Sequence, residues 1–143
     1  MTKPIWIVPI TIKELNRRSV GSLSEHLGIE FTEMGDDFLI ATMPIDKRTI
    51  QPMGIMHGGA SCVLAETVGS AAANYCVDPN LRICVGLDIN INHLRSVKSG
   101  LVTGIAMPLH LGKTTLVWEI KILNEPRQLV SASRLTMAVI ERK

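Results

Sequence analysis

The stretch Gly58-Gly-Ala-Ser-Cys-Val-Leu-Ala-Glu66-Thr-Val-Gly-Ser-Ala-Ala-Ala-Asn-Tyr-Cys-Val77 decides how this chain folds. It is rich in small apolar residues and contains one charged side chain, Glu66. Such a segment is typical of a helix that other elements surround on almost every side. A membrane span is the alternative, but the stretch is rich in Ala and Gly rather than Leu, and it lacks cationic flanks. We therefore predict a buried central helix over residues 58–77.

The composition of the chain limits the class of protein to which it can belong. Of the 143 residues, 46% are hydrophobic, which is enough for the core of one domain over residues 1–143. The net charge of +2 comes from scattered residues, which argues against a basic face for nucleic acid. Pro4 and Pro9 interrupt the start of the chain, so a secretory signal is not expected, and the three cysteines lack metal-ligand spacing. We expect a cytoplasmic protein with no metal, cofactor, nucleic-acid partner or membrane partner.

The remaining sequence predicts short elements around this helix. Residues 11–18 read as an amphipathic helix with Thr11 as its cap, and Gly35-Asp36-Asp37 reads as the turn of a hairpin between strands 27–34 and 38–43. Residues 82–92 alternate apolar and polar side chains, so we expect a strand with one core face and one polar face.

Three more strands are expected after this one, joined by short turns. Short turns favour an antiparallel meander. The fold class is therefore α+β, with one antiparallel sheet wrapped around one very apolar helix. Unpaired edges of such a sheet would favour joining of sheets between two subunits. The expected strands are 101–109, 115–123 and 129–140.

Glu66 is the first candidate for a catalytic group. Buried carboxylates are uncommon unless they are paired, and the run 58–77 contains no cation. Unpaired carboxylates in apolar surroundings are typical of acid–base or nucleophilic sites. The alternatives are a structural hydrogen bond that holds the carboxylate, or a helix face that is in fact exposed to water.

Gly58 and Gly59 stand at the start of the predicted helix. The first amides of a helix lack internal partners and lie at the positive end of its dipole, so they suit a carbonyl oxygen that becomes negative during a reaction. A tight turn into the helix is the alternative. Gly58 and Glu66 lie about 12 Å apart along the helix, so they can serve one reacting centre only if two subunits meet across a two-fold axis.

Three polar residues near these groups have weaker signals. His57 could position a substrate or merely bond to the helix backbone, and Gln51 could orient a carbonyl or be an ordinary loop residue. Ser70 lies four residues after Glu66 on the same helix face. Its hydroxyl could assist the carboxylate, or its small size could allow close packing.

The pattern Gln51-Pro-Met-Gly-Ile-Met-His-Gly-Gly-Ala-Ser61, followed by Leu64-Ala-Glu-Thr-Val-Gly-Ser70, resembles the hotdog-fold acyl-CoA thioesterases. The stretches 85–96, 110–114 and 117–120 agree with this resemblance. The pattern is most similar to the branch that contains the 4-hydroxybenzoyl-CoA thioesterase of the Glu-on-helix type and the 1,4-dihydroxy-2-naphthoyl-CoA thioesterase of menaquinone synthesis. The resemblance covers nearly the whole chain and implies the hotdog fold.

The resemblance also implies a role for each candidate. Glu66 matches the catalytic carboxylate, which acts as nucleophile or as general base on water, and the amide of Gly58 matches the group that polarises the thioester carbonyl. Gln51 and His57 match substrate-orienting residues, and Ser70 matches a hydroxyl that assists hydrolysis. The implied reaction converts an acyl-CoA, with an aryl or hydroxyaryl acyl group, to free acid and CoA. The implied assembly is a homodimer that forms the active site, two of which make a homotetramer.

Coenzyme A carries phosphates, and by resemblance His93, Arg95, Gly112 and Lys113 lie near its nucleotide end. Solvated charge at strand ends is the alternative reading of these residues. Met53 stands where relatives have an aromatic residue, so the resemblance does not determine the shape of the acyl pocket or the identity of the acyl group. A medium-chain fatty acyl-CoA thioesterase and a non-catalytic acyl-CoA binding or sensing module are the alternative functions.

Overall fold

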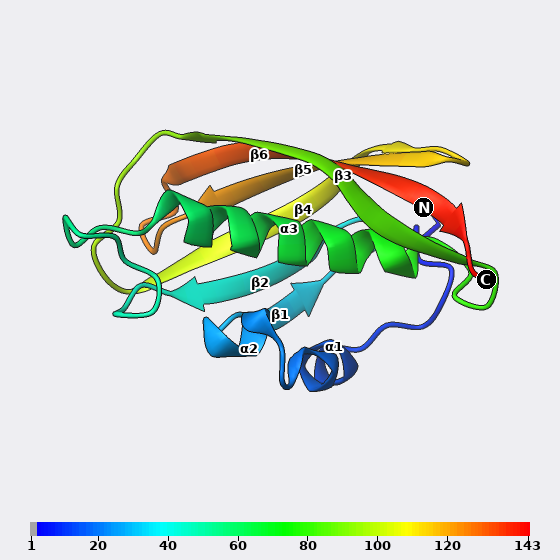
Figure 1. The fold of residues 1–143 in the computed structure, drawn as a ribbon, viewed down its shortest axis with the longest axis horizontal. Coiled ribbons are helices and arrows are strands. Elements are labelled where there is room, and N and C mark those ends of the chain that lie inside the picture. The colour runs from blue at the N-terminus through cyan, green and yellow to red at the C-terminus, as the bar shows by residue number, and fades with distance from the viewer. Residues whose placement is uncertain (1–2) are drawn as a thin grey trace.

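An antiparallel sheet of six strands, in the order β1-β2-β4-β5-β6-β3, curves around the long helix α3 (Gly58–Tyr75) (Figure 1). This computed structural model describes residues 3–143. It confirms the predicted α+β class with one sheet wrapped around one central helix. No helix within the described residues is long and apolar enough to cross a membrane. The strands are β1 (Glu30–Met34), β2 (Leu39–Pro44), β3 (Arg82–His93), β4 (Leu101–Leu111), β5 (Thr115–Leu123) and β6 (Leu129–Glu141).

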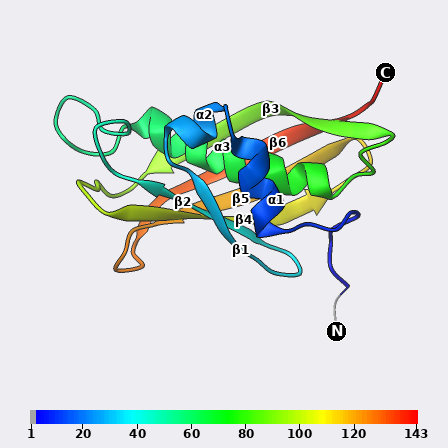
Figure 2. The same cartoon turned by 90° about the horizontal axis from the view of Figure 1, so that it is seen from below.

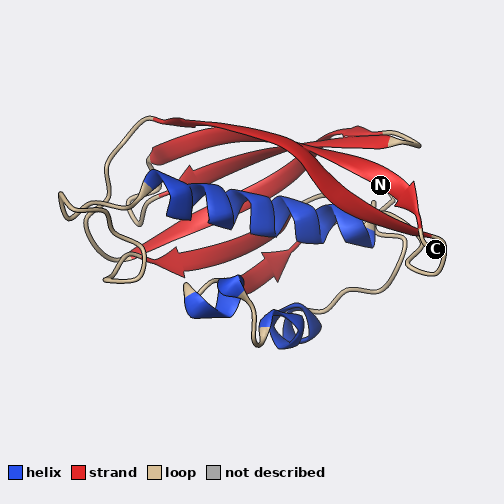
Figure 3. Cartoon of the chain, viewed as in Figure 1, coloured by secondary structure: helices blue, strands red, loops and turns tan. Residues whose placement is uncertain are grey.

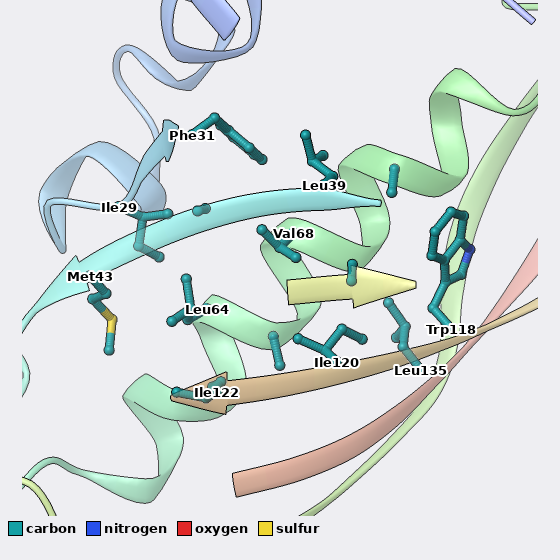
Figure 4. Packing of buried hydrophobic residues seen from close by; sticks show 14 of the residues in the cluster. Ile29, Phe31, Leu39, Met43, Leu64, Val68, Trp118, Ile120, Ile122 and Leu135 are labelled. Atoms are coloured by element: carbon teal, nitrogen blue, oxygen red, sulfur yellow. The ribbon is translucent and has the colours of Figure 1, made fainter. Parts of the chain in front are cut away.

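Small residues on α3 let the helix lie close to the sheet. A Cβ atom added to Gly69 would lie 2.8 Å from a methyl group of Leu135 and 3.0 Å from one of Ile120, so only glycine fits without a shift of its neighbours. Leu64 and Val68 on the same helix are fully buried against the concave face of the sheet (Figure 4). The predicted apolar helix is therefore the centre of the core.

The N-terminal elements confirm the local sequence signals. Helix α1 (Ile12–Ser19) begins after Thr11, whose Oγ1 accepts a hydrogen bond of 3.1 Å from the amide of Glu14. The hairpin of β1 and β2 also forms around the predicted turn. The first strand begins at residue 30 rather than 27, because the chain forms an unpredicted short helix, α2 (Leu23–His26), and turns at Gly28 with φ +72°. Helix α2 lies beside α3, and α1 packs against β1 and α2 (Figure 2).

Strand β3 differs from the predicted alternation of a core face and a polar face. Cys84, expected on the polar face, is buried, whereas Val85 and Leu87 are 39% and 64% exposed. A β-bulge between Gly86 and Asp88 shifts the register against β6 and interrupts the alternation. The strand also lies at the edge of the sheet, where one side has no neighbouring strand in the described chain.

The strands do not form one continuous meander. The segment β4-β5-β6 does follow the predicted pattern, but β3 pairs with β6 at the far edge, and β4 pairs with β2 instead. Helix α3 follows β2 in the chain and lies across the concave face of the sheet, and β3 then forms at the edge opposite β1 (Figure 3). As a result, the edge formed by β3 runs beside α3, where the candidate catalytic residues lie.

Candidate functional site

His57 caps the start of α3. Its Nδ1 accepts a hydrogen bond of 2.7 Å from the amide of Gly59, and its own amide donates to the carbonyl of Thr49 at 2.8 Å. Of the two readings of His57, the bond to the helix backbone is therefore present. Because Nδ1 is an acceptor, Nε2 carries the ring hydrogen of the neutral imidazole. The side chain is exposed, so this N–H can donate to a ligand.

Gly58, the first residue of α3, lies against the imidazole of His93. A Cβ atom added to Gly58 would lie 2.9 Å from Nε2 of His93, so a larger residue would displace that ring. No hydrogen-bond acceptor for the Gly58 amide is found within residues 3–143. This amide can therefore donate to an oxygen placed at the positive end of the helix.

A cavity of about 350 Å³ joins four of the predicted residues: Gln51, Gly58, His93 and Arg95 line it. The Gln51 Oε1 accepts a hydrogen bond from the amide of Met53. Its NH₂ group is left to donate into the cavity. The structure thus brings the substrate-orienting candidates and half of the CoA-binding candidates to one end of α3.

Thr49 holds the loop that shapes this end, and the sequence reasoning missed it. The residue is 1% exposed, and its Oγ1 donates to the carbonyl of Pro44 at 2.8 Å and accepts from the amide of Asp46 at 3.0 Å. Its carbonyl accepts the hydrogen bond from His57. A threonine between two exposed residues carries no clear signal of this role in the sequence.

Glu66 lies in the middle of α3, on the side that faces β3. It takes part in no salt bridge within the described part of the chain. The residue is half-buried, so the helix face that carries Glu66 is in part exposed to water, as one of the alternatives held. The sheet covers only one face of α3 and leaves a half-exposed stripe, which we call the open stripe of α3. It consists of Cys62, Val63, Glu66, Thr67, Ser70, Ala71 and Asn74.

Gly86 of β3 provides the space for the Glu66 carboxylate. A Cβ atom added to Gly86 would lie 2.6 Å from Oε1 of Glu66. The alternation of residues 82–92 predicts a polar strand face for Gly86 and does not predict this contact. An isolated glycine inside a strand pattern was the available signal, since it often marks a bulge or a close approach.

Asn74 fixes β3 to α3 next to this contact. Its Oδ1 accepts from the amide of Cys84 at 2.9 Å, and its Nδ2 donates to the carbonyls of Cys84 at 3.2 Å and Ser70 at 3.0 Å. The side-chain amide thus pairs with the backbone of β3 as a neighbouring strand would. This contact holds the strand over the helix and was not predicted.

The other two CoA-binding candidates lie at the opposite end of α3. Gly112 and Lys113 line a cavity of about 500 Å³ together with Arg82. Within one chain they are therefore not brought together with His93 and Arg95.

The cysteines near the site are thiols rather than thiolates. Burial, followed by the negative charge of Glu66, raises the pKa of Cys62. Burial also raises the pKa of Cys76 to about 12 and that of Cys84 to about 11. A raised pKa lowers the fraction of nucleophilic thiolate, so Glu66 is the stronger candidate for a catalytic group on α3.

Comparison with known proteins adds four findings. The sequence profile of the Thioesterase superfamily matches residues 53–131. The 1,4-dihydroxy-2-naphthoyl-CoA hydrolase of Escherichia coli is 48% identical over 136 residues, which cover 95% of this chain and 99% of that protein. The proofreading thioesterase EntH of Cronobacter turicensis is 49% identical, with 95% and 98% covered. A crystal structure of a thioesterase from Haemophilus influenzae superimposes with a TM-score of 0.93 at 47% identity, over 96% of this chain and 95% of that one.

Proposed function

The chain belongs to the thioesterase superfamily, and we propose that it hydrolyses an aryl-CoA or hydroxyaryl-CoA thioester to the free acid and CoA. The observation that carries the proposal is the unpaired, half-buried carboxylate of Glu66 on the open stripe of α3. The aryl class follows from the Escherichia coli relative, which is named for its action on a naphthoyl-CoA.

The proposed roles follow from the free donors and acceptors. The Gly58 amide donates to the thioester oxygen and stabilises the negative charge that develops there. The Nε2–H of His57 and the NH₂ group of Gln51 hold the acyl carbonyl in position. Glu66 attacks the carbonyl carbon or removes a proton from the attacking water, and the Ser70 hydroxyl assists it.

We infer that this site forms between two subunits. Gly58 and Glu66 lie about 12 Å apart along one helix, too far to act on one carbonyl. Strand β3 offers a sheet edge of 12 residues with the exposed apolar side chains of Val85 and Leu87. An unpaired edge of this kind favours pairing with the same edge of a second chain across a two-fold axis.

The same two-fold axis would complete the CoA site. The β3 strands of the two subunits would pair antiparallel across this axis, so His93 and Arg95 of one subunit would approach Gly112 and Lys113 of the other. The combined cations would hold the CoA phosphates. Two such dimers form the tetramer that the resemblance implies.

Thiol release from a panel of aryl-CoA and fatty acyl-CoA substrates tests the reaction. We expect release from benzoyl-CoA-type substrates, and a loss of about 100-fold or more in kcat for Glu66→Gln at unchanged folding. Thermal unfolding and size-exclusion chromatography of the variant provide the control. Tight binding of acyl-CoA without turnover by the wild type would instead favour the binding-module reading.

Subunit complementation tests the shared site. Glu66→Gln and His57→Ala chains are each expected to be inactive. After the two are mixed and refolded together, half of the dimers would contain both kinds of chain, and each of these would have one intact site. Activity would then return to about a quarter of the wild-type value, provided that the sites are shared as proposed. An inactive mixture that nevertheless contains heterodimers would contradict the shared site.

A further inference from the structure

A second cavity, about 430 Å³ in volume, lies beside the open stripe of α3. Its floor is formed by α3, where Thr67 follows Glu66 in sequence and Ala71 follows Ser70. Leu15 and Phe31 contribute apolar wall, and the volume suits a small organic group. Glu66 does not line the cavity, but Thr67 and Asn74 of the open stripe do, so the cavity lies along the same stripe as the proposed catalytic carboxylate.

Three arginines surround this cavity: Arg18 of α1, Arg82 of β3 and Arg142 after β6. None of them forms a salt bridge within the described residues, and no Asp or Glu lines the cavity. Glu141 stands opposite Arg82 in the β3–β6 register but is not within salt-bridge distance. Three exposed arginines that line one cavity and have no carboxylate partner in the described residues are suited to a carboxylate, which arginine binds in a bidentate manner.

Arg18 is held in place over the cavity before any ligand binds. Its Nη1 donates to the hydroxyl of Tyr75 at 3.1 Å, and its guanidinium carbon lies 5.8 Å from the centre of the Tyr75 ring. The nearest acid on its own helix, Glu14, is already bonded to Arg17 at 2.6 and 2.8 Å. Little side-chain freedom would therefore be lost when Arg18 binds an anion.

We propose that this cavity receives the acyl group of the substrate and that its arginines recognise a carboxylate at the end of that group distal to the thioester. The inference rests on the proposed thioesterase reaction and narrows its substrate class. Tyr75 lies about 13 Å beyond Glu66 along α3, a distance that a bicyclic aryl group and an arginine side chain together span. The apolar walls from Leu15 and Phe31 hold the rings, and Arg18, Arg82 and Arg142 bind the carboxylate.

Two substrates of the same shape test this proposal, 6-carboxy-2-naphthoyl-CoA and 6-carbamoyl-2-naphthoyl-CoA. They differ only in the distal group, which is a carboxylate in the first and a neutral amide of similar shape in the second. We expect the wild type to favour the carboxylate by about tenfold to 100-fold in kcat/KM, the range for a hydrogen bond to a charged group. Arg18→Gln and Arg82→Gln should each reduce this preference. Lys13→Gln is the matched control, because it removes a positive charge of α1 that neither lines the cavity nor forms a salt bridge in the described part of the chain, and it should retain the preference.

The outcomes separate this inference from the proposed function. Equal turnover of the two substrates by the wild type would overturn the carboxylate site and leave the thioesterase reaction standing. An equal loss on both substrates in the arginine variants would place these residues on the CoA phosphates or in the fold, and would overturn the inference too. No release from these substrates or from benzoyl-CoA would refute the proposed reaction and the inference with it. Arg18→Lys, which keeps the charge, should keep part of the preference if Arg18 acts through its charge.

Discussion

Substitution of Gly86 by alanine should displace the Glu66 carboxylate without unfolding the protein. The added Cβ atom would lie 2.6 Å from Oε1 of Glu66, which is 0.8 Å short of the ordinary contact distance of 3.4 Å. The neighbouring atom is the free end of a flexible side chain, so the carboxylate can move away at little cost in stability. Gly86 does not have a positive φ, and alanine is therefore compatible with its backbone.

A movement of this size is large for a catalytic group. Misplacement of a reacting group by about 1 Å can reduce the rate by about 100-fold. We expect kcat for benzoyl-CoA in Gly86→Ala to fall by about this factor, while the free energy of unfolding changes by less than about 1 kcal/mol. The KM should change little, because the proposed CoA-binding residues are untouched.

The assay combines thiol-release kinetics with denaturant unfolding of the same preparation. Val20→Ala is the control, because it alters an exposed residue that lies outside β3 and α3. A kcat for Gly86→Ala within about twofold of the wild type would refute the reasoning, since it would mean that the position of this carboxylate does not limit the reaction.

Three further predictions concern stability and reactivity. Leu64→Ala should reduce the free energy of unfolding by about 2–5 kcal/mol, because Leu64 is fully buried, whereas Val20→Ala at a 68% exposed position should change it by less than about 0.5 kcal/mol in the same denaturant titration. Asn74→Ala should reduce stability by about 1–3 kcal/mol and speed hydrogen exchange at the amide of Cys84, and unchanged exchange would contradict its role between α3 and β3. Cys76, whose pKa burial raises to about 12, should be alkylated slowly at pH 8, where about one thiol in 10,000 is ionised. The rate should rise about tenfold per pH unit, and mass spectrometry that finds rapid labelling of the native protein at pH 8 would contradict this.

The candidate site could be predicted in part because its signals are local. The lone charge of Glu66 in an apolar run and the glycines at the start of α3 are visible in the sequence. The contacts of Gly86 and Asn74 are not visible in the sequence. Each contact joins a residue of β3 to a residue of α3, and no short sequence pattern indicates which residues of two separate elements will meet.

The sequence by itself determined the elements that depend on interactions between neighbouring residues. The small apolar residues of α3, the Thr11 cap and the turn at Gly35-Asp36-Asp37 each act within a few neighbouring residues, so reading them in order was sufficient. The tertiary structure alone decided that β3 lies at the sheet edge, that Val85 is exposed and Cys84 buried, and that Lys113 lies far from His93 within one chain. These features depend on which strand pairs with which. The hydrophobic periodicity of a segment indicates which of its faces is apolar, but it does not indicate which strand or helix covers that face.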